Sequence, residues 1–178
     1  MSQVMNKTKR YFNLLPLLLA VIFVSSASAD GGTVLTLSGE VKASPCTVDA
    51  TTKPVTLGTY YISTMKEKGD YVKFSVTLSS CPTGTSSVTA TFSGNADASL
   101  PGSYYANTTA QGAATGIHIE LATDDTTPAG LGNGKTLKAS VDSNKKVEFK
   151  LQARVNKGDA TPTSGVIQTT VNITYEYA

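Results

Sequence analysis

The chain has 178 residues, 40% of them hydrophobic and 16% charged, which is enough for a domain with a real core. Fifteen basic and thirteen acidic residues give a formal charge of +2, too little for the basic surface that nucleic-acid binding requires. One histidine and two cysteines offer few metal ligands, so we expect no cofactor and no metal centre.

The N-terminus has the three parts of an export signal. Lys7, Lys9 and Arg10 are basic, an apolar run covers 14–24, and small residues stand at 27–29. The run of about eleven residues is short against the roughly twenty that span a bilayer, and the Ala-Ser-Ala site favours cleavage after Ala29 over an uncleaved anchor. Residues 1–29 are therefore predicted to be a signal peptide, which leaves 149 residues (178 minus 29) with a charge of −1 (12 basic minus 13 acidic).

Two cysteines, Cys46 and Cys81, remain after this cleavage. Export to an oxidising compartment predicts a disulfide between them. A loop of this length should stabilise the fold by roughly 3–4 kcal/mol. A metal site is the alternative, but the chain has no Cys-x-x-Cys motif and no set of further ligands.

Apolar and polar residues alternate along most of the remaining chain, which is the period of a β-strand. Stretches with Gly, Pro and Asp separate the alternating runs, and residues 64–70 favour a solvated loop over a helical turn. The pattern predicts an all-β sandwich of six to seven strands, the clearest of them at 33–43, 71–79, 87–93, 116–122, 146–155 and 166–177.

The last predicted strand reaches almost to the end of the sequence and places four apolar residues on one face, Val171, Ile173, Tyr175 and Tyr177. An immunoglobulin-like sandwich normally has a further strand that covers this edge. A long apolar edge left open would promote aggregation. We therefore expect a segment from another chain to cover it.

The exported chain resembles the subunits of chaperone–usher fimbriae, the type 1 fimbrial pilin family. The resemblance rests on the opening GGTVLTLSGEV, on Pro45-Cys46-Thr47-Val48 followed by Val55-Thr56-Leu57-Gly58, and on Cys81 after FSVTLSS. It also rests on a penultimate aromatic residue, Tyr177, and on Gly165, fourteenth from the end. It implies an incomplete immunoglobulin-like domain at 43–178 and an N-terminal donor-strand extension at 30–42.

The resemblance implies donor-strand exchange, in which the extension of one subunit completes the sandwich of the next. Residues of one parity in the extension, Leu35, Leu37, Gly39 and Val41, would then enter the groove of a neighbouring subunit, with Gly39 at a shallow point. The alternative is that this strand belongs to its own sandwich. Gly165 would let the chain turn into the last strand, whose edge a periplasmic chaperone would bind before an outer-membrane usher assembles the fimbrium on the cell surface.

Two other classes of function are an enzyme and a receptor-binding subunit. Enzyme candidates are few: His118 lies between isoleucines and is expected on the surface, and Asp124-Asp125 lies in a turn, although a carboxylate pair can bind calcium. A copper–zinc superoxide dismutase would need several histidines. The stronger alternative is a tip adhesin or adaptor that binds a host receptor, with Tyr104-Tyr105 as its candidate loop.

Overall fold

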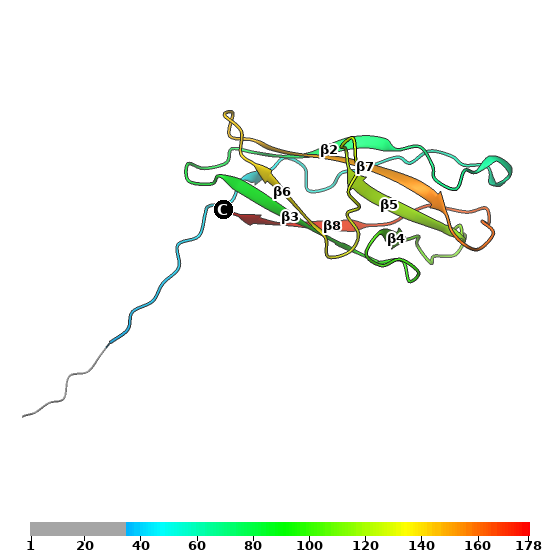
Figure 1. Cartoon of the computed structure of the whole chain (residues 1–178), viewed down its shortest axis with the longest axis horizontal. Coiled ribbons are helices and arrows are strands. Elements are labelled where there is room, and N and C mark those ends of the chain that lie inside the picture. Colours follow the sequence, from blue (N-terminus) through cyan, green and yellow to red (C-terminus); the bar gives the residue numbers. More distant parts are fainter. Residues whose placement is uncertain (1–34) are drawn as a thin grey trace, which may run out of the picture. The chain divides into compact units, whose positions relative to one another are not determined.

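The computed structural model describes residues 35–178, so the predicted signal peptide and residues 30–34 lie outside the described part (Figure 1). Within residues 35–178 no helix is long and apolar enough to cross a membrane. The secondary structure of this part consists of strands and one short 3-10 turn: β1 (Thr47–Val48), η1 (Ile62–Thr64), β2 (Val72–Ser79), β3 (Ser87–Gly94), β4 (Tyr104–Ala106), β5 (Ile117–Thr123), β6 (Thr136–Ser140), β7 (Val147–Lys157) and β8 (Val171–Tyr177).

The strands form two antiparallel sheets. One has the order β1-β2-β7-β5-β4 and the other has the order β6-β3-β8. Alternate residues point inward between the sheets, because successive side chains of a strand lie on opposite faces. The core is built from these residues, among them Leu78, Val88, Phe92, Phe149 and Leu151. The predicted all-β sandwich is confirmed.

A disulfide joins Cys46 to Cys81, as the sequence predicted, and both residues are buried in the core. Cys46 directly precedes β1, and Cys81 follows β2 by one residue. The bond therefore fixes the start of the domain to the end of the strand with which β1 pairs.

Four predicted strands agree with β2, β3, β5 and β7 to within two residues at either end. The last predicted strand is too long at its start, because β8 begins only at Val171. Three short strands, β1, β4 and β6, were not predicted. The segment 64–70 contains no α-helix, as expected, although a single 3-10 turn precedes it.

The predicted strand at 33–43 lies partly outside the described residues, and its described part, 35–43, is assigned to no strand. The chain divides into two units, of which the second, from Glu40 to Ala178, contains all the strands. In the first unit, Leu35 and Leu37 are 77% and 85% exposed. An extended segment needs a partner strand to form a sheet, and the described residues supply none to this one.

Candidate functional site

The strand β8 lies at the edge of its sheet. Its residues pair with β3 from Gly94↔Val171 to Val88↔Tyr177, and no described strand pairs with its other side. Its side chains alternate as the sequence predicted, with Val171, Ile173, Tyr175 and Tyr177 half-buried and the residues between them exposed. The free edge therefore offers unpaired backbone N–H and C=O groups beside an apolar row.

A groove of about 870 Å³ runs along this free edge. Val171, Ile173 and Tyr175 of β8 line one side, and the segment 50–58, which forms no strand, lines the other. The floor is the inner face of the five-stranded sheet, formed by Phe74, Val76, Ile119, Leu121, Leu151 and Ala153. A strand is missing between β8 and the segment 50–58, so the hydrophobic core opens into the groove.

Apolar side chains form the floor of the groove and its β8 wall, and Tyr177 continues the row of β8 beyond it. The ring of Tyr175 stacks with that of Phe149 at a centroid distance of 6.1 Å. Burial raises the pKa of Tyr175, with a further contribution from the nearby Tyr177 hydroxyl, and burial likewise raises the pKa of Tyr177. Such a surface can take up alternating apolar side chains from an extended segment while the edge of β8 bonds to its backbone.

The C-terminus is anchored at one end of the groove. The backbone N–H groups of Ser86 and Ser87 donate to the carbonyl oxygen of Ala178 at 2.6 and 3.0 Å. Beside it, residues 40–44 and 175–178 line a hollow of about 920 Å³ together with Thr83 and Gly84. The extension therefore leaves the domain next to the C-terminal end of β8.

The four residues predicted to be donors are accessible where they are described. Val41 is fully exposed, as Leu35 and Leu37 largely are, and a side chain added at Gly39 would contact nothing within 4 Å. Large aliphatic side chains fully exposed to water are unfavourable by about 1.5–3 kcal/mol each relative to burial. These residues are therefore available to a partner.

Gly165 lies at a bend in the chain six positions before β8 begins, and its backbone φ is not positive. A Cβ atom added at Gly165 would lie 2.4 Å from the backbone nitrogen of Ala114 and 2.6 Å from the carbonyl oxygen of Gly112. Glycine is required here because two backbone segments approach closely, beside the bridge between Ala113 and Val166.

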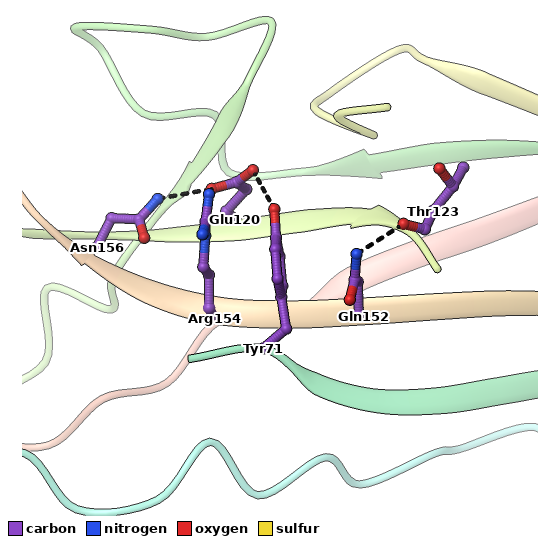
Figure 2. A network of polar contacts seen from close by, with 6 residues as sticks. All are labelled: Tyr71, Glu120, Thr123, Gln152, Arg154 and Asn156. Atoms are coloured by element: carbon purple, nitrogen blue, oxygen red, sulfur yellow. Dashed lines mark hydrogen bonds and ion pairs between the residues drawn. The ribbon is translucent and has the colours of Figure 1, made fainter. Parts of the chain in front are cut away.

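On the outer face of the five-stranded sheet, Glu120 is the centre of a polar network (Figure 2). Its carboxylate accepts hydrogen bonds from the Tyr71 hydroxyl at 2.7 Å, from Nε of Arg154 at 2.8 Å and from the Asn156 amide at 2.7 Å, and Nη2 of Arg154 forms an ion pair with it at 2.8 Å. Burial alone would raise the pKa of Glu120, but these donors outweigh it and hold the pKa below its usual value. Burial, with the hydrogen bond to Glu120, raises the pKa of Tyr71 to about 12.

This network was not foreseen from the sequence. Its members come from β2, β5 and β7 or the residue before them, and no local motif joins them. The only signal was their parity: Glu120 alternates with buried residues in β5, Arg154 and Asn156 stand two positions apart in β7, and Arg154 is the one arginine after the predicted signal. The three strands hold these side chains together. The charges of Glu120 and Arg154 pair with each other, so the network offers no free charge to a substrate.

His118 was expected on the surface, and this prediction is wrong. The isoleucines beside it do face the core, but the His118 side chain on the other face is only 14% exposed. Its Nδ1 lies 2.9 Å from a carboxylate oxygen of Asp97, and its ring stacks on Tyr104 at 5.2 Å. The unpredicted strand β4 carries Tyr104 and so covers the histidine.

The predicted receptor-binding loop is also different in the structure. Tyr105 belongs to β4 and is fully buried, and its hydroxyl donates to the carbonyl oxygen of Leu131 at 2.8 Å. Asp124 pairs with Lys73 at 2.6 Å, while Asp125 is exposed. Among residues 35–178, no three His, Cys, Asp or Glu side chains gather as a metal site would require.

Comparisons with known proteins agree with this architecture. The sequence profile of the fimbrial protein family matches residues 35–178. The FimG protein of Escherichia coli K12 is 36% identical over 165 residues, covering 90% of this chain and 95% of FimG. A type-1 fimbrial protein subunit of Serratia marcescens is 35% identical over 178 residues, covering 92% and 97% of the two chains.

Among solved structures, the P pilus rod subunit PapA superposes with a TM-score of 0.60 at 16% identity, over 76% of this chain and all of that one. This likeness supports the fold, an immunoglobulin-like sandwich that lacks a strand. The family match and the two relatives extend over nearly the whole domain. The chain therefore belongs to the fimbrial protein family and is a fimbrial subunit of the chaperone–usher type.

Proposed function

We propose that this subunit polymerises by donor-strand exchange, in which its groove receives residues 35–41 of a neighbouring subunit. The observation that carries the proposal is the groove of about 870 Å³, which opens the core beside the free edge of β8. A strand inserted there would cover the core residues that line the groove and would form hydrogen bonds with the free backbone edge of β8. A neighbouring extension supplies both the apolar side chains and the backbone groups.

The extension and the groove have the same repeat. In the extension, the apolar positions Leu35, Leu37 and Val41 are separated by even numbers of residues, as Val171, Ile173 and Tyr175 are in β8. Side chains two residues apart on a strand are about 7 Å apart and point the same way. Gly39 interrupts the apolar series where two backbones approach closely.

The polarity of the inserted strand follows from where the extension leaves the domain. Residues 40–44 line the hollow beside Tyr177 and Ala178, at the C-terminal end of β8. A strand inserted parallel to β8 would bring the neighbouring domain to this same end, where the chain's own extension leaves. An antiparallel strand places the neighbour at the Val171 end, so each subunit donates at one end, accepts at the other, and an open fibre forms.

Before assembly, the exposed core of the groove needs protection. We assign this role to a periplasmic chaperone that covers the β8 edge, and delivery to the growing fibre to an outer-membrane usher. An apolar groove of this size beside a free strand edge is a site of aggregation in an isolated subunit. The resulting fimbrium would lie on the cell surface and serve adhesion, with any host receptor bound by this or another subunit.

Thermal melting of a chain that begins at residue 43, refolded with and without a synthetic peptide of residues 30–42, tests the exchange. We expect the peptide to raise the melting temperature, because it fills the groove and binds the folded state alone. A peptide with Leu35→Asp and Leu37→Asp is the matched control and should give no rise. A shortened domain whose melting is the same with either peptide would show that the sandwich is already complete.

The alternative function is that of a tip adhesin. Its predicted binding loop forms the packed strand β4, in which the hydroxyl of Tyr105 is hydrogen-bonded. Binding of the peptide-complemented subunit to a glycan array would support that reading. The exchange test and the glycan test are independent, because a subunit can polymerise and also bind a receptor.

A further inference from the structure

A second apolar surface lies at the end of the groove where β8 begins. Leu57 and Ile167 line the groove there and, with Tyr60 and Met65, pack on the buried residues Ala114, Ile117 and Val155. Within two positions of Tyr60 or Ile167 in the sequence stand three large apolar side chains exposed to solvent, Tyr61 at 72%, Ile62 at 48% and Val166 at 55%. We call these three residues the end patch.

The end patch is far from the donating end of the domain. The turn η1, which begins at Ile62, lies at the opposite end from the C-terminus (Figure 1). The side chains of Tyr61 and Ile62 are carried outward by this turn, which contains no buried residue. Tyr60 and Met65 on either side hold the turn, since both pack on the small cluster, and the Tyr60 hydroxyl donates to the carbonyl oxygen of Leu57 at 2.9 Å.

The length of the extension fixes how near the neighbouring domain must come. Val41, the last donor residue, is five positions before Cys46, which the disulfide ties to the domain. Five fully extended residues reach at most about 18 Å. With an antiparallel donor strand, Val41 lies near Val171, so the neighbour's Cys46 lies within this distance of Val171, at the end of the domain that carries the end patch. The two domains are therefore adjacent at this end.

We propose that the end patch is a second interface between subunits, which docks on the surface around Thr83 and Gly84 of a second copy of this chain. This inference rests on the proposed donor-strand exchange, because the exchange sets which ends meet. Thr83 and Gly84 are exposed, and they line the hollow of about 920 Å³ from which the extension leaves. The hollow offers a receiving surface for the ring of Tyr61, and docking removes three exposed apolar side chains from water.

The docking limits how freely successive subunits rotate about the short linker. Donor-strand exchange alone joins two domains through a few extended residues, which leaves their relative orientation free. Contact at the end patch adds a second attachment point and fixes the orientation. The end patch thus sets fibre stiffness, whereas the groove sets whether a fibre forms.

Site-specific photo-crosslinking in fibres assembled from the exported full chain tests the inference. A photoreactive amino acid placed at Tyr61 should crosslink to a neighbouring copy, with the joined peptide mapping to the segment around Thr83 and Gly84. The matched control places the same amino acid at Leu100, which is 49% exposed in the connection between β3 and β4 and lines neither the groove nor the hollow. Crosslinking at Tyr61 should exceed that at Leu100 several-fold.

A double variant, Tyr61→Ser with Ile62→Ser, provides the second readout. We expect its fibres to bend more in electron micrographs, while the rise in melting temperature on adding the 30–42 peptide stays unchanged. Normal fibres with equal crosslinking at Tyr61 and Leu100, or a variant as stiff as the wild type, would overturn the docking and leave the exchange standing. Failure of the peptide to raise the melting temperature would instead overturn the exchange, and the docking with it.

Discussion

The guanidinium carbon of Arg154 lies 4.0 Å from the centroid of the Tyr71 ring, and both side chains donate hydrogen bonds to Glu120. The arginine comes from β7 and the tyrosine from the residue before β2, so their contact ties together strands that pair in the sheet. The stacking supplements the ion pair, since a cation over an aromatic face contributes about 0.5–2 kcal/mol. This network stabilises the rigid face of the domain, opposite the face that opens into the groove.

Glu120→Gln should destabilise the domain by roughly 1–3 kcal/mol, because Arg154 keeps a largely buried charge without its partner. The effect should depend on pH. The pKa of Glu120 is lowered in the folded chain, so its stabilisation is present above the usual glutamate pKa of about 4.3 and is lost as the pH falls through the folded value. Urea unfolding at several pH values should show the difference between variant and wild type shrinking below about pH 4.

The exposed carboxylate of Glu148 on β7 gives the matched control. Glu148→Gln should change stability by less than about 0.5 kcal/mol at any pH, as exposed surface substitutions usually do. A Glu120→Gln variant as stable as this control at neutral pH would show that the network contributes nothing to the fold.

Gly165→Ala tests the close approach of two backbone segments. The added methyl would meet backbone atoms of Gly112, Ala113 and Ala114 at 2.4–2.6 Å, so one segment has to move. We expect a loss of about 1–3 kcal/mol in thermal unfolding, as overpacking usually costs. Gly130→Ala is the control, because no atom lies within 4 Å of its added methyl. Equal melting temperatures for the two variants would contradict the role assigned to Gly165.

Breaking the disulfide should weaken the fold without changing which residues pack in it. The bond spans 35 positions, and closing such a loop stabilises a protein by about 3–4 kcal/mol on chain-entropy grounds. A Cys46→Ala, Cys81→Ala double variant should therefore unfold at lower urea concentration, with a slope at least as steep, because the unfolded chain without the cross-link exposes more surface. An unchanged midpoint would indicate that β1 and the packing of residues 43–48 already fix this end.

The predicted strands agree with the structure where a long alternating run contributes side chains to the core. In β3, for example, Val88, Ala90 and Phe92 are fully buried. The three strands that were missed carry weaker signals. β1 has two residues and β4 has three, too few to show a period, and β6 is a short edge strand in which only Leu137 and Ala139 are half-buried. Short edge strands owe their pairing to neighbours that are distant in the sequence, which no local pattern encodes.

The groove could be predicted only in part. One wall was predicted, because the apolar residues of β8 alternate with polar ones. The other wall, residues 50–58, contains Pro54, Gly58 and few apolar residues, so its sequence supported the family resemblance but did not predict a groove wall. The burial of His118 was missed for the same reason as β4, because Tyr104 reaches it from a strand too short to predict.

The groove itself is tested by Ile173→Asp. Ile173 is half-buried, lines the groove and stands in the middle of β8, so a carboxylate there would have to be buried when a donor strand enters. We expect the variant to lose the rise in melting temperature that the 30–42 peptide gives, and to lose incorporation into fibres. Thr174→Asp places the same charge one residue later on the exposed face of the strand.

The two variants, Ile173→Asp and Thr174→Asp, compare the inward face of β8 with its exposed face. Both variants place one negative charge on β8, on opposite faces of the strand, so a difference in peptide binding between them reports the inward face. Thr174→Asp should bind the peptide like the wild type. If both variants bind it equally, the donor strand does not lie against the inward face of β8, and the segment must complete the fold elsewhere.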